Sequence, residues 1–170
     1  MLARRACVVV AMAAAVLPAA LVGCGSSGAS APSNQGQEAQ TNIANPFVDC
    51  ASAYDAAQLA GFEVTFPESV PGYDQRLYQA IEGKMAQCSY SNGDKRVLVR
   101  KALGDEDISG DYNTYSQLNT VPVGELQVTE KGEGGLVHVA TWSRDGYSFA
   151  IDADEGLEPT VVEWLVEATL

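Results

Sequence analysis

A short acidic segment carries the residue types that could hold a metal ion. Oxygen-bearing side chains occupy every second position, with a glycine at the sixth: Asp105, Asp107, Ser109, Gly110, Asp111 and Asn113. This spacing follows the start of an EF-hand calcium loop. The twelfth position is Ser116, where that loop requires a bidentate Glu. We therefore favour side chains that cap local turns, and we keep a weak calcium site, completed by a distant carboxylate, as the alternative.

Two cysteines in the body of the chain are candidates for a disulfide. An even pair, Cys50 and Cys88, would pair readily in an exported protein. The bridge would close a loop of about 39 residues and contribute about 4 kcal/mol in the chain-entropy model. Two buried free thiols are the alternative, because cysteine often serves as a small apolar residue. With a single histidine, the pair falls short of the usual zinc ligand set.

The other groups that could take part in catalysis are isolated. His138 is the only histidine, and strand alternation places it on one face with Leu136 and Ala140. The acidic run 152–155 follows the last predicted strand, where we expect it to solvate the sheet end. No Gly-x-Ser-x-Gly elbow, phosphate loop or His-Glu-x-x-His motif occurs. We predict a protein without enzyme activity or cofactor.

The N-terminus has the pattern of an export signal with a lipid attachment site. Arg4 and Arg5 precede an apolar run that ends in Leu-Val-Gly-Cys24. This ending resembles a bacterial lipobox, in which the cysteine takes a diacylglyceryl group and becomes the mature N-terminus. The resemblance implies removal of residues 1–23 and a lipid on Cys24, with no cofactor other than that lipid. It also implies a place on the outer face of the cell membrane, which we expect to be that of a Gram-positive bacterium.

Removal of the leader would also change the net charge of the protein. The whole chain carries 10 basic and 22 acidic residues, a net charge of −12. The leader holds two of the basic residues, so the mature chain is more acidic still. Such a charge disfavours nucleic acid and anionic headgroups as partners, leaving the lipid as the membrane anchor. Residues 24–44, rich in Gly, Ser, Ala, Gln and Asn, predict a lipidated cysteine and a flexible tether.

Residues 45–170 predict one α+β domain. Ser52 and Gly61 have the positions of helix caps, which predicts a short helix over 52–60. Alternating apolar residues and turn signals predict an antiparallel meander of about six or seven strands. They lie at 62–66, 76–81, 84–90, 96–101, 124–130, 136–142 and 147–151. Asn92-Gly93 favours a type I′ hairpin turn. An apolar stripe over 159–170 predicts a C-terminal helix packed on the sheet.

Several segments also resemble an uncharacterised family. The residues that carry the resemblance are Asn45-Pro46-Phe47, Asp49-Cys50, Leu59-Ala60-Gly61-Phe62, Asp107 to Asn113, Ala140-Thr141-Trp142 and Gly146-Tyr147-Ser148. The family is domain of unknown function 4367, found in membrane-attached proteins of Gram-positive bacteria. The resemblance implies an exported domain and adds nothing about mechanism.

From these features we expect a lipid-anchored, non-enzymatic binding or envelope-associated module whose protein or small-molecule partner is unknown. A carrier or sensor of a hydrophobic or peptidic ligand in a sheet groove is the first alternative. A weak calcium-dependent adhesion module, resting on Asp105 to Asn113, is the second.

Overall fold

The computed structural model describes residues 45–170; the predicted signal peptide, Cys24 and the tether lie outside the described residues. Two helices and eight strands form the described part. The helices are α1 (Ala53–Ala60) and α2 (Pro159–Ala168). The strands are β1 (Val48–Cys50), β2 (Gln75–Ile81), β3 (Met85–Asn92), β4 (Lys95–Leu103), β5 (Gln117–Val123), β6 (Leu126–Glu133), β7 (Leu136–Arg144) and β8 (Tyr147–Leu157). No helix among residues 45–170 is long and apolar enough to cross a membrane.

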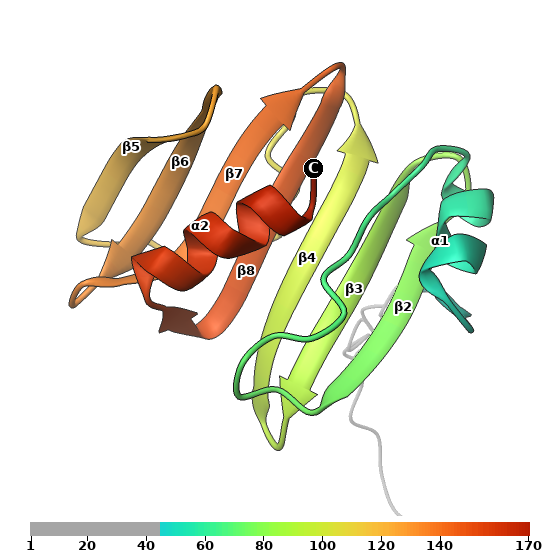
Figure 1. The fold of residues 1–170 in the computed structure, drawn as a ribbon, viewed down its shortest axis with the longest axis horizontal. Coiled ribbons are helices and arrows are strands. Elements are labelled where there is room, and N and C mark those ends of the chain that lie inside the picture. Colours follow the sequence, from blue (N-terminus) through green and yellow to red (C-terminus); the bar gives the residue numbers. More distant parts are fainter. Residues whose placement is uncertain (1–44) are drawn as a thin grey trace, which may run out of the picture. The chain divides into compact units, whose positions relative to one another are not determined.

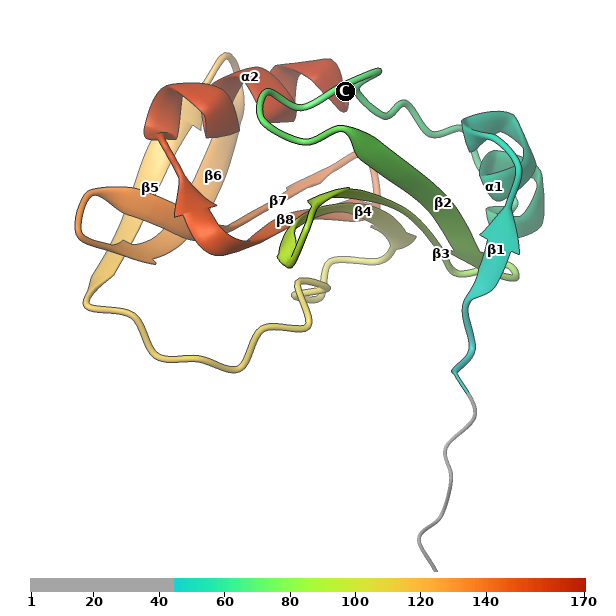
Figure 2. The same ribbon diagram turned by 90° about the horizontal axis from the view of Figure 1, so that it is seen from below.

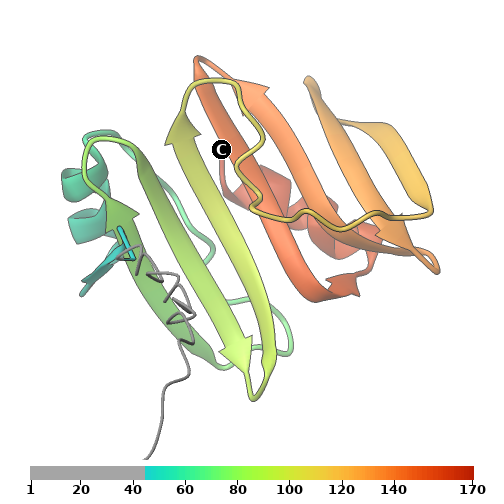
Figure 3. The ribbon, with the colours of Figure 1, turned by 180° about the vertical axis from the view of Figure 1, so that it is seen from behind.

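All eight strands belong to one antiparallel sheet in the order β1-β2-β3-β4-β8-β7-β6-β5. The α+β prediction is confirmed, whereas six or seven strands is too low a number. The sheet is also not a simple meander. After β4, residues 104–116, here called the crossover, carry the chain to the opposite edge (Figures 1 and 3). The strands β5 to β8 then return until β8 pairs with β4.

Local sequence signals explain most of the elements. Ser52 Oγ accepts from the Asp55 amide at 3.1 Å, and Gly61 ends α1 with φ +82°. These caps confirm the predicted first helix. Pro159 begins α2, where its missing amide hydrogen costs no helical bond. The buried residues of α2 are Val162, Leu165 and Val166, which confirms the predicted apolar stripe.

One predicted strand is absent, and two strands that were not predicted are present. Residues 62–66 alternate apolar and polar side chains but pair with no strand of the described chain. Conversely, β1 and β5 were not predicted, because β1 has only 3 residues and β5 lacks a regular apolar alternation and contains Pro122. Both lie at sheet edges, where a proline can be tolerated because one side of the strand needs no donor.

The Asn92-Gly93 hairpin also differs from its prediction. Asn92 pairs with Lys95, so Gly93 and Asp94 are the two central turn residues. Gly93 has φ +60° and Asp94 does not have a positive φ, the pattern of a type II′ turn. The type I′ pattern occurs instead between β7 and β8, where both Asp145 and Gly146 have positive φ.

The two faces of the sheet are covered differently. Both helices and residues 61–72 lie over one face, the helix-side face, and the crossover runs below the other, the crossover-side face (Figure 2). On the helix-side face, Trp142 stacks on Phe149 at 5.2 Å and Tyr90 donates to the Pro67 carbonyl at 2.5 Å. Buried residues from both helices and seven strands are continuous there, so this face is filled with side chains.

Candidate functional site

A row of polar side chains crosses four strands on the crossover-side face. Asp49, Gln79, Gln87 and Arg100 are successive cross-strand partners on β1, β2, β3 and β4. Gln79 donates to Asp49 at 2.7 Å, Gln87 donates to Gln79 at 2.7 Å, and Arg100 Nε donates to Gln87 at 2.9 Å. Each glutamine thus accepts a hydrogen bond from one neighbouring strand and donates one to the other. The guanidinium of Arg100 is the donor at the end of the row.

Arg100 fastens the crossover to the sheet. Its Nη1 donates to the carbonyls of Ile108, at 3.0 Å, and Ser109. Burial lowers the pKa of Arg100 below its ordinary value, although the nearby Asp152 carboxylate acts in the opposite direction. Gly110 must remain small here, because a Cβ would lie 2.8 Å from Nη1 and its φ is +71°. The guanidinium therefore substitutes for the sheet hydrogen bonds that an irregular segment lacks.

The calcium candidates use their oxygen atoms within the crossover. Asp107 accepts from the Ser109 amide at 2.9 Å, Ser109 Oγ accepts from the Asp111 amide at 3.3 Å, and Asp111 accepts from the Asn113 amide at 2.7 Å. Three successive side-chain turns thus shape this segment. Asp105 is exposed beside them. Within residues 45–170, no three His, Cys, Asp or Glu side chains are grouped to hold a metal ion.

The hydrogen bonds of Asp107 and Asp111 also hold these carboxylates in their ionised form. Burial opposes ionisation of Asp107, but donation from Ser109 and from Lys131 lowers its pKa overall. Burial likewise opposes ionisation of Asp111, and donation from the Tyr115 hydroxyl at 2.8 Å and from Asn113 outweighs it. Both carboxylates are therefore ionised and already accept hydrogen bonds from other residues of the crossover.

Cys50 and Cys88 are free thiols, so the candidate disulfide is not formed. The register explains why: Cys50 pairs with Tyr78, which pairs with Cys88 on its other side. One whole strand separates the two cysteines, a span of roughly 10 Å between Cα atoms, beyond the reach of a disulfide. Cys88 is buried, and burial raises the pKa of its thiol to about 11.

His138 does not follow simple alternation. A bulge between Val137 and Val139 shifts the register of β7 against β8. His138 stacks on Tyr115 of the crossover at 5.1 Å, while Ala140 lies in the helix-side core. His138 Nδ1 lies 3.2 Å from the Ala153 carbonyl. The prediction that His138 and Ala140 share a face is wrong, because a bulge places two neighbouring residues against one.

The acidic run 152–155 belongs to β8 and does not follow it. Glu155 pairs with Lys95 at 2.5 Å and Asp154 with Arg96 at 3.2 Å, both across the β4–β8 pair. These exposed pairs join neighbouring strands. Asp152 is half-buried on the crossover-side face, where burial raises its pKa and the charges of Arg100 and Arg96 partly offset the rise.

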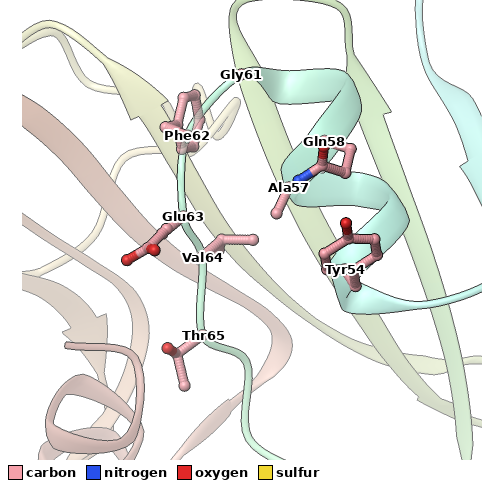
Figure 4. Close-up of a pocket in the computed structure, with 8 residues that line it drawn as sticks. All are labelled: Tyr54, Ala57, Gln58, Gly61, Phe62, Glu63, Val64 and Thr65. Carbon is pink, nitrogen blue, oxygen red and sulfur yellow. The ribbon is translucent and has the colours of Figure 1, made fainter.

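A groove of about 640 Å³ lies between α1 and the chain that follows it (Figure 4). Ala57 and Val64 face each other across it, and the ring of Tyr54, which is 71% exposed, lies at one end. Gln58 and Gly61 also line the helix side. The opposite wall is residues 62–65, in which no backbone amide or carbonyl is bonded to another backbone group of the described chain.

Lys101 holds this wall in place from the helix-side face. Its Nζ donates to the Glu63 carbonyl at 2.8 Å. The same ammonium lies over the rings of Tyr147, at 4.4 Å, and Phe62, at 5.6 Å. Phe62 and Tyr147 themselves pack at 5.1 Å. The Lys101 ammonium and the rings of Phe62 and Tyr147 therefore fix an extended segment that does not pair with any strand of the described chain.

Sequence reasoning did not find the groove residues or Arg100. A signal for Arg100 exists, since it follows the apolar run Val97 to Val99 directly, within the same predicted strand. Charged residues are seldom buried in a strand unless they are paired. The unpaired state of residues 62–66 has no sequence signal, because their alternation is the same as that of a paired strand.

Comparison with known proteins gives no match: neither a family model, nor a curated protein, nor a solved structure matches this chain. The resemblance to domain of unknown function 4367 therefore stays a prediction.

Glu130 on β6 makes stability depend on pH. It is 7% exposed, and burial raises the pKa of its carboxyl, with a further rise from Glu163 on α2. The folded state thus keeps a proton at pH values where the unfolded chain has lost it, so stability falls as pH rises through that interval. We expect Glu130→Gln to raise the free energy of unfolding at pH 7 and to lose this advantage near pH 4.

Urea unfolding at the two pH values measures the effect. Glu133→Gln, at the exposed end of the same strand, is the matched control. A Glu130→Gln variant that is less stable than the parent at pH 7, or that has the same advantage at both pH values, contradicts the assignment.

Proposed function

We propose that the protein is an exported lipoprotein, held at the outer face of a Gram-positive cell membrane by a lipid on Cys24. The charged leader, the Leu-Val-Gly-Cys ending and the tether support this placement. The resemblance of residues 45–170 to domain of unknown function 4367 points to the same compartment. Two or three acyl chains on the cysteine would suffice for stable anchoring without help from the acidic domain.

We propose further that the domain is a binding module, not an enzyme, and that the groove beside α1 takes an extended peptide. The unpaired backbone of residues 62–65 carries this proposal. In β-augmentation a peptide pairs with an extended segment that makes no backbone–backbone hydrogen bonds of its own. Residues 62–65 are such a segment, although the Glu63 carbonyl already accepts from Lys101. Tyr54 and Val64 offer apolar contacts beside that edge, and Lys101 fixes the segment before binding, which lowers the entropy lost on association.

The two alternatives have less support. A carrier would need space between the helices and the sheet, but buried side chains fill the helix-side face. A calcium-dependent adhesion module would need free oxygens in the crossover, whereas Asp107, Ser109 and Asp111 already accept hydrogen bonds from backbone amides.

For the anchor, we expect protein extracted from the membranes of a Gram-positive host to begin at Cys24 with a diacylglyceryl group. Intact-mass analysis measures this, and Cys24→Ala is expected to abolish the modification because the thiol that takes the lipid is missing. A membrane-bound chain that begins at Met1, or an unmodified Cys24, contradicts the proposal.

For the groove, peptides selected from a displayed random library on the folded domain are expected to bind beside α1. Tyr54→Ala removes the exposed ring, and Ala57→Arg fills the groove without entering the core. Each should weaken binding of a selected peptide about fivefold or more, the usual cost of losing an interface anchor. Titration calorimetry measures the dissociation constants.

Tyr112→Ala is the matched control, because Tyr112 is 97% exposed and lies outside the groove. If the library yields no enriched peptide, or if the selected peptides bind all three variants as tightly as the parent domain, the groove is not the peptide site.

A further inference from the structure

A cleft on the crossover-side face lies beside the polar row that ends at Arg100. Its volume is about 450 Å³, within the usual range for small-molecule sites. The sheet side is lined by Phe47, Ile81 and Met85, and residues 107–112 of the crossover line the other side. Ile81 and Met85 are cross-strand partners on β2 and β3, two residues along from the polar row. The sheet side of the cleft is therefore apolar and continues directly into the polar row.

The cation that lines this cleft has no anionic partner in direct contact. Arg100 is the basic residue of the lining, and it makes no ion pair within residues 45–170. The Asp152 carboxylate acts on its charge without forming a salt bridge. Burial lowers the pKa of Arg100, because removal from water disfavours the charged form. A bound carboxylate would therefore offset the cost of burying this guanidinium.

One terminal nitrogen of Arg100 is left for a ligand. Nε donates to Gln87 on β3 at 2.9 Å, and Nη1 donates to the carbonyls of Ile108 and Ser109. Nη2 makes no hydrogen bond within the described chain and is not fully buried there. In the planar guanidinium, Nη2 lies on the same side as the Nε hydrogen, so both are directed toward β3. The cleft beside Met85 of β3 lies on that side.

The carboxylates of the lining already accept hydrogen bonds. Asp107 accepts from the Ser109 amide at 2.9 Å and from Lys131, which neutralises its charge. Asp111 accepts from the amide of Asn113 at 2.7 Å. A peptide would bring backbone amides that need acceptors, and these carboxylates are already bonded. The lining therefore favours a ligand that has one anionic group and an apolar body.

We propose that this cleft binds an aliphatic monocarboxylate, the chemistry of a free fatty acid. The carboxylate accepts from Nη2 of Arg100, and the hydrocarbon chain lies against Phe47, Ile81 and Met85. Exposed carboxylates elsewhere on this acidic chain repel the anion only weakly at physiological salt, because the Debye length is then about 8 Å. The site is on the crossover-side face, separate from the groove beside α1, and neither proposal depends on the other.

Met85 can report binding from inside the cleft. The chain has three methionines, so a ¹³C label on the methionine methyl groups gives few NMR signals, and Met85→Leu assigns the signal of the cleft. The probe is octanoate, and we expect it to shift the Met85 signal saturably. Octanamide keeps the chain and the carbonyl but lacks the charge, so it should bind at least tenfold more weakly. Butanoate should also bind at least tenfold more weakly, because it lacks four of the methylene groups that contact the apolar wall.

Two matched variants locate the site. Ile81 and Leu77 lie on β2, each two residues from Gln79 and on the same face, but Ile81 lines the cleft and Leu77 does not. We expect Ile81→Asp to weaken octanoate binding at least tenfold, because it removes an apolar contact and adds a negative charge. Leu77→Asp adds the same charge outside the cleft and should change binding less than twofold.

The ligand series does not depend on how well either variant folds. The proposal is overturned if octanoate gives no saturable shift of the Met85 methyl signal, or if octanamide or butanoate binds as tightly as octanoate. Equal effects of Ile81→Asp and Leu77→Asp in two folded variants would also overturn it, because the anion would then respond to the charge of the sheet face and not to this cleft.

Discussion

Two adjacent cations on β4 hold the irregular parts of this fold. Arg100 points to the crossover-side face and bonds the carbonyls of Ile108 and Ser109. Lys101 points to the helix-side face and bonds the carbonyl of Glu63. Because successive side chains of a strand point to opposite faces, these two neighbours each hold a different unpaired segment, one on each side of the sheet. Without these bonds, both segments would leave backbone carbonyls without a protein partner.

The strand order follows from the segment that Arg100 holds. The crossover must travel from β4 to the far edge before β5 can begin, and it makes no sheet ladder on the way. Arg100 and the turns at Asp107, Ser109 and Asp111 fix its path. That path also brings the acidic residues of the crossover beside β6 and β7.

Features that depend on neighbouring residues were predicted from the sequence. Features that depend on pairing between distant segments of the chain were not. The caps at Ser52 and Gly61 and the hairpins among β2, β3 and β4 depend on neighbouring residues, which the sequence displays directly. Whether residues 62–66 find a partner strand, and where β5 is placed, depends on segments far along the chain. The bulge at His138 and the strand between the two cysteines are likewise properties of register. A one-residue shift in register changes which side chains meet, and no local pattern records it.

Amide hydrogen exchange tests most directly whether Arg100 fixes the crossover. Arg100→Lys keeps the charge but cannot reach Gln87 and two carbonyls together. We predict that the amides of Ser109, Asp111 and Asn113 exchange at least tenfold faster in this variant, while those of β7 and β8 keep their protection. Arg96→Lys, at an exposed position on the same strand, serves as the control. Unchanged protection of the crossover amides in Arg100→Lys would contradict the claim.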